Sequence, residues 1–111
     1  MTTHFSSVFE HDKQRCVYCG RWMLADFDTF MLTEEDHLLP VRHGGNDNDG
    51  NRVTACRVCN MLKHDYVPEG GADLLQENKG KYLQLVRDHI ALQRSKKLAE
   101  YFSWIQSKKR D

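Results

Sequence analysis

The residues best able to do chemistry lie in one stretch, between Glu35 and Asp65 of the 111-residue chain. The stretch contains an Asp36-His37 pair, a loop with two adjacent glycines, and a Cys-X-X-Cys sequence followed directly by Asn60. Carboxylate, thiolate, imidazole and amide groups are the groups with which proteins hold metal ions, and a free imidazole can also carry a proton. This stretch is therefore the first candidate for a functional site.

The four cysteines form two Cys-X-X-Cys pairs, Cys16 with Cys19 and Cys56 with Cys59. Paired knuckles of this spacing usually present four thiolates to one tetrahedral zinc ion. Such a zinc has no open coordination position and cannot activate water. We therefore predict a structural Zn²⁺ that ties the first knuckle to the start of a helix at the second.

Two disulfides, or a redox-active pair, are the alternatives for these cysteines. The first fourteen residues, MTTHFSSVFEHDKQ, contain no apolar signal segment, and the cytoplasmic setting that this predicts disfavours disulfides. A redox pair is usually found in a βαβ context, which the sequence lacks. No apolar run approaches the length that spans a membrane, so we expect no membrane contact.

Charge divides the chain into two unlike halves, although the formal net charge is zero. Residues 1–50 carry four Lys/Arg and nine Asp/Glu, a net of −5, whereas residues 51–111 carry twelve and seven, a net of +5. The basic half could face a polyanion, or it could be the solvated surface of helices. The length predicts one domain over residues 1–111.

Two short strands and a helix are needed to position the candidate residues. Residues 33–40 have the pattern of a strand that carries Asp36 and His37 and stops at Pro40, and residues 51–55 can pair with it. The polar residues 41–50 form the connecting loop. A helical pattern begins at Cys56 and would place Asn60 and His64 on one face.

The flanking segments have weaker patterns. Residues 1–14 predict a loop or short leading segment, and the aromatic-rich residues 21–32 predict a pair of strands. We interpret the latter as core rather than as a nucleobase-stacking surface. Residues 72–107 show a helical apolar stripe, as one kinked helix or as two, with Gly80 a weak spot and Ser95 a possible break, and we expect them to pack on the core.

Strand, loop, strand and helix in this order, with Asp-His on the first strand and Cys-X-X-Cys-Asn on the helix, resemble the HNH nuclease family. The resemblance covers about residues 16–65 and rests on CVYCG, EDHLLP, GG, NRV and ACRVCNMLK. It implies an α+β fold, with a ββα-metal (His-Me finger) core at about residues 16–65, a zinc knuckle and a C-terminal helical extension at about 72–107.

The resemblance also implies a role for each catalytic position. His37 would be the general base that takes a proton from the attacking water, and Asp36 would bind the divalent metal ion. Asn51 would hold the hairpin and orient the histidine. Asn60 stands where many members have a histidine, and resembles the asparagine that the HNH domains of RNA-guided nucleases use as an oxygen ligand.

Two oxygen ligands, from Asp36 and Asn60, favour Mg²⁺ or Mn²⁺ as the catalytic metal. His64 resembles the last histidine of the colicin DNases and would widen the choice to Ni²⁺ or Zn²⁺; a surface histidine is the alternative. The glycine pair, Gly44 and Gly45, would let the backbone approach a duplex, or would serve a tight turn.

Three basic residues, Arg42, Arg57 and Lys63, are candidate phosphate contacts in this scheme, with ordinary surface charges as the alternative. The resemblance implies a metal-dependent endonuclease that hydrolyses DNA phosphodiester bonds to 3′-hydroxyl and 5′-phosphate ends. We predict a double-stranded DNA substrate with low sequence specificity, or delivery by a targeting protein partner. The alternative is a non-catalytic zinc module that binds nucleic acid or a protein partner.

Overall fold

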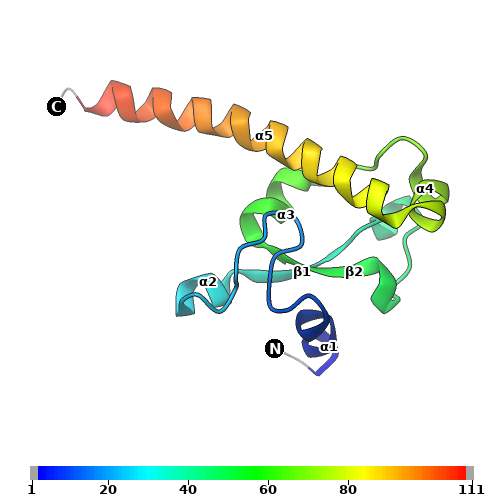
Figure 1. Ribbon diagram of the computed structural model, residues 1–111. Helices are drawn as coiled ribbons and strands as arrows, with labels where there is room; N and C mark the ends of the chain where they lie inside the picture. Colours follow the sequence, from blue (N-terminus) through cyan, green and yellow to red (C-terminus); the bar gives the residue numbers. More distant parts are fainter. Residues whose placement is uncertain (1–2, 110–111) are drawn as a thin grey trace.

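The structure, a computed structural model, describes residues 3–109, with side chains from Ser7 onward. It is a mixed α/β structure with one two-stranded sheet and a long C-terminal helix (Figure 1). The elements in chain order are α1 (Thr3–His11), α2 (Phe27–Met31), β1 (Thr33–His37), β2 (Arg52–Cys56), α3 (Arg57–Lys63), α4 (Gly71–Glu77) and α5 (Lys79–Lys108). The loop between the strands contains two 3₁₀ turns, Val41–His43 and Asp49–Asn51.

The sheet confirms the predicted pair of strands. β1 and β2 are antiparallel, with Thr33 opposite Cys56 and His37 opposite Arg52. Side chains alternate between the two faces of a strand, so Asp36 and His37 point to opposite faces. β2 is buried along its whole length and leads directly into α3, as predicted for the segment around Cys56.

The core joins the sheet to the first half of α5. Its buried residues include Phe9, Met23, Leu38, Val53, Ala55, Tyr82, Val86 and Ile90. The hydroxyl of Tyr82 donates to the backbone oxygen of Leu38 at 2.7 Å, and Arg87 Nε donates to that of Val17 at 2.8 Å. The first half of α5 is therefore part of the scaffold that holds the end of β1.

The C-terminal helices break two residues before Gly80, the predicted weak spot, and not at Ser95. The chain breaks at Asn78, whose side chain accepts from the N–H of Lys81 and caps α5, and Ser95 lies inside that helix. The last third of α5 projects away from the rest of the molecule (Figure 1). Its Tyr101, Phe102 and Trp104 are exposed, so the expectation that the whole helix packs on the core is wrong for this part.

Two other segments also differ from the sequence prediction. Residues 3–11 are helical rather than a loop, while residues 1 and 2 lie outside the described range. Residues 21–32 contain the short helix α2, capped by Asp26, which accepts from the N–H of Thr29 at 2.7 Å. Of the large apolar residues here, Met23 is buried, but Phe27 is 72% exposed and Met31 61%. Interpreting this segment as core was therefore wrong.

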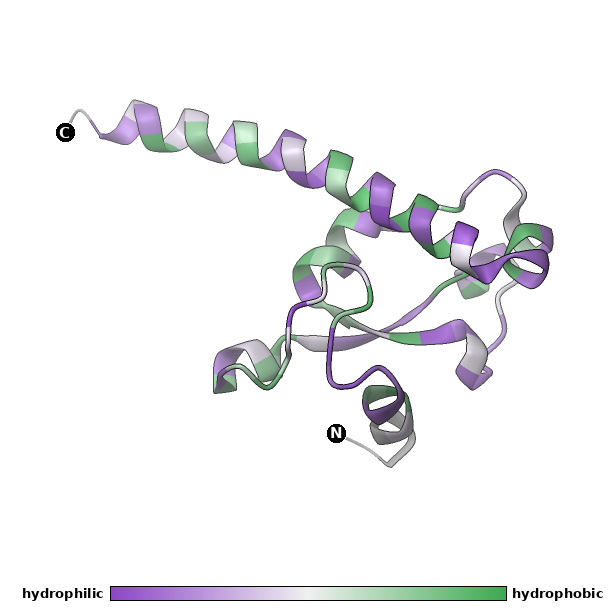
Figure 2. Ribbon diagram, viewed as in Figure 1, coloured by the Kyte–Doolittle hydropathy of each residue, from purple (hydrophilic) through white to green (hydrophobic). Residues whose placement is uncertain are grey.

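In Figure 2, hydrophobic residues alternate with hydrophilic ones in and next to α2 and along the projecting end of α5. None of the helices among residues 3–109 is both long enough and apolar enough to cross a membrane.

Candidate functional site

Four sulfur atoms from two distant parts of the chain meet at one point. The Sγ atoms of Cys16, Cys19, Cys56 and Cys59 all lie within 4.8 Å of one another. Those of Cys19 and Cys56 are 3.9 Å apart, close to the spacing of about 3.8 Å that tetrahedral Zn–S bonds of about 2.3 Å require. The cluster is therefore compatible with the predicted structural zinc.

Local structure aims these cysteines at the centre. Gly20 follows the first knuckle with φ of +80°, and its N–H donates to the backbone oxygen of Cys16 at 2.8 Å. Cys56 ends β2 and caps α3, because its sulfur accepts from the N–H of Cys59 at 3.4 Å.

Arg94 adds a positive charge beside this cluster. Its Nη2 lies 3.5 Å from the sulfur of Cys59, so α5 supplies a cation next to the sulfurs. The sequence analysis treated Arg94 only as one of the basic residues of the C-terminal half, residues 51–111. The available signal was its position four residues after the buried Ile90, on the same face of the helix.

Asp36 is held by two donors, one from the zinc knuckle and one from α3. Its Oδ2 accepts from the hydroxyl of Tyr18 at 2.5 Å and from the ammonium of Lys63 at 2.9 Å. Burial, and then the charge of Asp36, raise the pKa of Tyr18 well above its usual value, so this hydroxyl keeps its proton. Tyr18 lies between Cys16 and Cys19, and it links the cysteine cluster directly to Asp36.

Lys63 is fully buried, with 0% of its side chain exposed. Besides Asp36, its ammonium contacts the backbone oxygen of His37 at 2.9 Å. A buried ammonium cannot reach a phosphate group of a bound duplex, so the predicted phosphate contact does not fit this structure. Lys63 instead connects the two residues of the Asp-His pair.

His37 is the last residue of β1, and its side chain is 30% exposed. Its Nε2 lies 2.8 Å from Oδ1 of Asp47 in the loop between the strands. Arg52, opposite His37 in the sheet, has a buried side chain that pairs with Glu35 at 3.1 Å and also binds Asp49. This buried guanidinium holds the loop that carries Asp47. The sequence analysis did not identify Arg52 or Asp47 as part of the site.

Asn60 contacts β1 two residues before Asp36, at Glu34. Its Nδ2 donates to Oε1 of Glu34 at 2.8 Å, and Glu34 also pairs with Arg57 at 3.4 Å. Glu34 stands two residues before Asp36, on the same face of β1. It is a further carboxylate at the candidate site, and that spacing was the signal that could have identified it.

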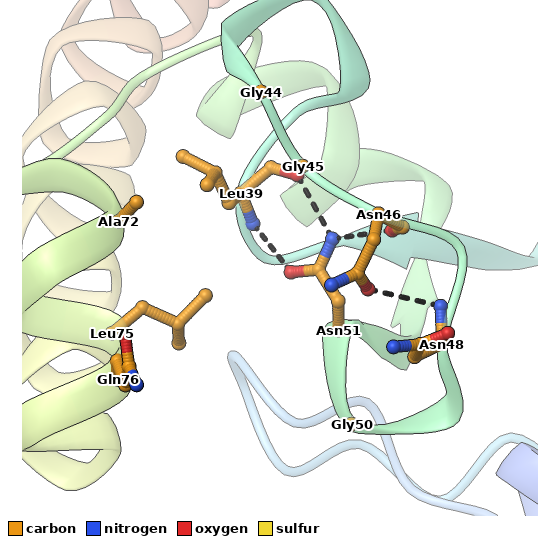
Figure 3. Close-up of a pocket in the computed structure, with 10 residues that line it drawn as sticks. All are labelled: Leu39, Gly44, Gly45, Asn46, Asn48, Gly50, Asn51, Ala72, Leu75 and Gln76. Atoms are coloured by element: carbon orange, nitrogen blue, oxygen red, sulfur yellow. Dashed lines mark hydrogen bonds between the residues drawn. The ribbon is translucent and has the colours of Figure 1, made fainter.

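Asn51 holds the two ends of the loop together (Figure 3). Its Oδ1 accepts from the N–H of Leu39 at 2.9 Å, and its Nδ2 donates to the backbone oxygens of Leu39 at 3.0 Å and Asn46 at 2.8 Å. A Cβ on Gly45 would lie 1.7 Å from the oxygen of Leu39. The close approach that this glycine permits is therefore to the chain's own hairpin.

His64 and Arg42 lie at the edge of the site. The helix ends at Lys63 and His64 has φ of +54°, so the expectation that Asn60 and His64 share a helix face is wrong. The side chain of His64 is 79% exposed and contacts Asp65 at 2.7 Å. That hydrogen bond, and the charge of Arg42 at 3.3 Å, lower the pKa of Asp65.

An Asp-His pair on a two-stranded sheet, backed by a helix and a four-cysteine cluster, is the arrangement found in one class of nuclease-type domain. Residues 16–66 match the family model described as HNH endonuclease. This segment is less than half of the chain, is similar to the HNH family, and contains every candidate residue described above except Arg94. Neither a curated protein nor a solved structure matches the chain.

Proposed function

We propose that this protein is a metal-dependent endonuclease that hydrolyses phosphodiester bonds of double-stranded DNA. In this proposal β1, β2 and α3 form a ββα-metal core, and the whole chain is one domain. The observation that carries it is the Asp36-His37 pair at the end of β1, in the segment that matches the HNH family model, with the Asp36 side chain only 12% exposed and that of His37 30% exposed.

His37 is the proposed general base. A base must offer an unprotonated nitrogen to water, and the contact between Nε2 and Asp47 favours the tautomer whose proton is on Nε2. Nδ1 is then the nitrogen that accepts the proton of the attacking water. Lys63 holds the backbone oxygen of His37, so the strand end that carries the imidazole is fixed.

Asp36 and Asn60 are the proposed ligands of a catalytic divalent metal, with Glu34 as a third oxygen donor. The contacts of Asp36 with Tyr18 and Lys63 use Oδ2, and the contact of Asn60 with Glu34 uses its amide nitrogen. The oxygen donors suit Mg²⁺ or Mn²⁺. When bound, such an ion would neutralise the negative charge that develops on the phosphoryl oxygens and the leaving oxygen. The exposed His64 is left out of this set.

Arg42 and Arg57 remain candidate phosphate contacts, because their side chains are 70% and 60% exposed. The described residues do not include a separate sequence-reading domain beside the HNH segment, and we propose low sequence specificity or delivery by a protein partner. The non-catalytic alternative is favoured by one observation, the exposed lysines on the projecting end of α5.

Cleavage of supercoiled plasmid tests the proposal. The wild type is compared with His37→Ala in Mg²⁺, Mn²⁺, Ni²⁺ or EDTA, after both proteins are shown to hold one zinc per chain. His11→Ala, which changes an exposed histidine on α1, is the matched control. Metal-dependent cleavage that His37→Ala loses and His11→Ala keeps is the expected result. DNA binding without cleavage by any of the proteins would instead establish the non-catalytic module.

A further inference from the structure

The exposed large hydrophobic side chains are concentrated in two places. Among the side chains described, all but Val41 and Leu92 belong either to residues 22–32 or to α3 and the end of α5. The first group, here called the α2 patch, comprises Trp22, Leu24, Phe27, Met31 and Leu32. The second includes Val58, Met61, Leu98, Tyr101, Phe102 and Trp104. Monomeric soluble proteins rarely expose apolar side chains in such groups without a partner.

Part of the second group lines a groove between α3 and α5, with a volume of about 310 Å³. The lining residues of this α3–α5 groove are Val58, Met61, Leu62, Arg94, Lys97, Leu98 and Tyr101. Its floor is apolar and both of its charged residues are cations. The Lys97 side chain is 70% exposed and pairs at 3.3 Å with Glu100 one turn further along α5, so the rim carries a cation that solvent and a partner can reach. A matching occupant has protruding apolar side chains beside carboxylates.

The α2 patch has these properties. Phe27 and Met31 are four residues apart on one helix, so they project from the same face, and they are 72% and 61% exposed. Asp26 and Asp28 are both exposed and flank Phe27 in the sequence. The two parts of the chain that carry these surfaces also have opposite net charges, −5 for residues 1–50 and +5 for residues 51–111.

We propose that two copies of this chain pair by inserting the α2 patch of each into the α3–α5 groove of the other. Both surfaces are exposed in the single chain, so each is free to meet a second copy. In a twofold pair the same contact forms twice and closes, which doubles the buried area and leaves no open end for further growth. A formal net charge of zero adds no overall repulsion between the copies. This inference does not depend on nuclease activity.

Sedimentation of the zinc-loaded protein over a range of concentrations measures the pairing. Phe27→Ser and Leu98→Ser each remove a central apolar contact and should weaken self-association by about 10- to 100-fold. Leu92→Ser changes an exposed leucine outside both surfaces and should have no effect. All three positions are at the surface, and unchanged circular dichroism and zinc content will show that the variants fold.

A charge exchange tests which surfaces meet. Asp28→Lys and Lys97→Glu should each weaken the pair, and the double variant should recover much of the loss, because the two charges face each other across the contact. Lys96→Glu is the control, because it makes the same charge change at a residue that is next to the groove but does not line it. A protein that stays monomeric at every concentration would overturn the proposal. So would a dimer that is insensitive to both serine variants, or a double variant no better than the single ones.

Discussion

Lys63 and Asp36 form a buried ion pair across the space between α3 and β1, with Nζ 2.9 Å from Oδ2. The lysine side chain is 0% exposed and that of the aspartate 12%. The same ammonium reaches the backbone oxygen of His37. The last residue of the helix thus fixes both members of the Asp-His pair from inside the protein.

Lys63→Met should therefore destabilise the protein strongly. Removing one partner leaves the other charge buried and uncompensated, which typically costs about 3–5 kcal/mol. Urea unfolding of zinc-loaded protein measures this, and Lys96→Met, at an exposed lysine of α5, should change the free energy of unfolding by less than about 0.5 kcal/mol. Asp36→Asn should cost less in the Lys63→Met background than alone. Additive effects of the two changes would contradict the pairing.

Gly45→Ala should distort the loop that carries Asn51. A Cβ 1.7 Å from the backbone oxygen of Leu39 forces the backbone apart, and we expect a loss of about 3 kcal/mol or more in the free energy of unfolding. Gly50→Ala in the same loop is the control, because a Cβ there meets nothing within 4 Å. Equal stability of the two variants in urea would show that the hairpin is not closely packed at Gly45.

Arg94→Met should weaken zinc binding while the helix stays folded. The guanidinium lies 3.5 Å from the sulfur of Cys59, and partners of metal ligands commonly affect metal affinity by about 10- to 100-fold. Competition with a chromophoric chelator measures the zinc affinity, and Lys96→Met is again the control. An unchanged affinity would show that Arg94 only packs against the cluster. Full removal of zinc from the wild type should unfold residues around both knuckles, seen by circular dichroism.

The raised pKa of Tyr82 predicts how the free energy of unfolding changes at alkaline pH. Burial, and then the charge of Asp36, raise its pKa to about 12, whereas an unfolded tyrosine titrates near 10. The folded state therefore holds this proton more tightly, so the contribution is fully present below about pH 10 and is lost as the pH rises toward about 12. Urea midpoints in this range should fall less steeply for Tyr82→Phe. Tyr101→Phe, at an exposed tyrosine, should follow the wild type.

The parts of the site that the sequence predicted are those set by local spacing. The knuckles, the Asp-His strand and the asparagine before β2 are each defined by neighbours within a few residues, and their order along the chain was enough to place them. The partner of Asp36 was not predictable in this way. Lysine is rarely buried unless paired, so Lys63 was assigned to the surface, and only packing of α3 on β1 brings it to Asp36.

The expectation that residue type indicates burial also failed for residues 21–32 and for the end of α5. Large apolar side chains are usually inside a small domain, and Phe27 was assigned to the core on that basis, while Phe102 belonged to the helical apolar stripe that was expected to pack on the core. In the structure the core is closed by α1, the sheet and the first half of α5, so these side chains stay outside. A single sequence cannot distinguish an apolar residue that packs within its own chain from one that packs on another.

The contacts that hold β1 and α3 in place come partly from residues that the ribosome adds late in synthesis. Leu38 receives its hydrogen bond from Tyr82, which lies 44 residues further along the chain, and Arg94 reaches Cys59 from 35 residues away. A ribosome releases the N-terminal part first. A nascent chain that has exposed Asp36 and His37 still lacks the helix that completes their scaffold. Unfinished chains would thus have no assembled site.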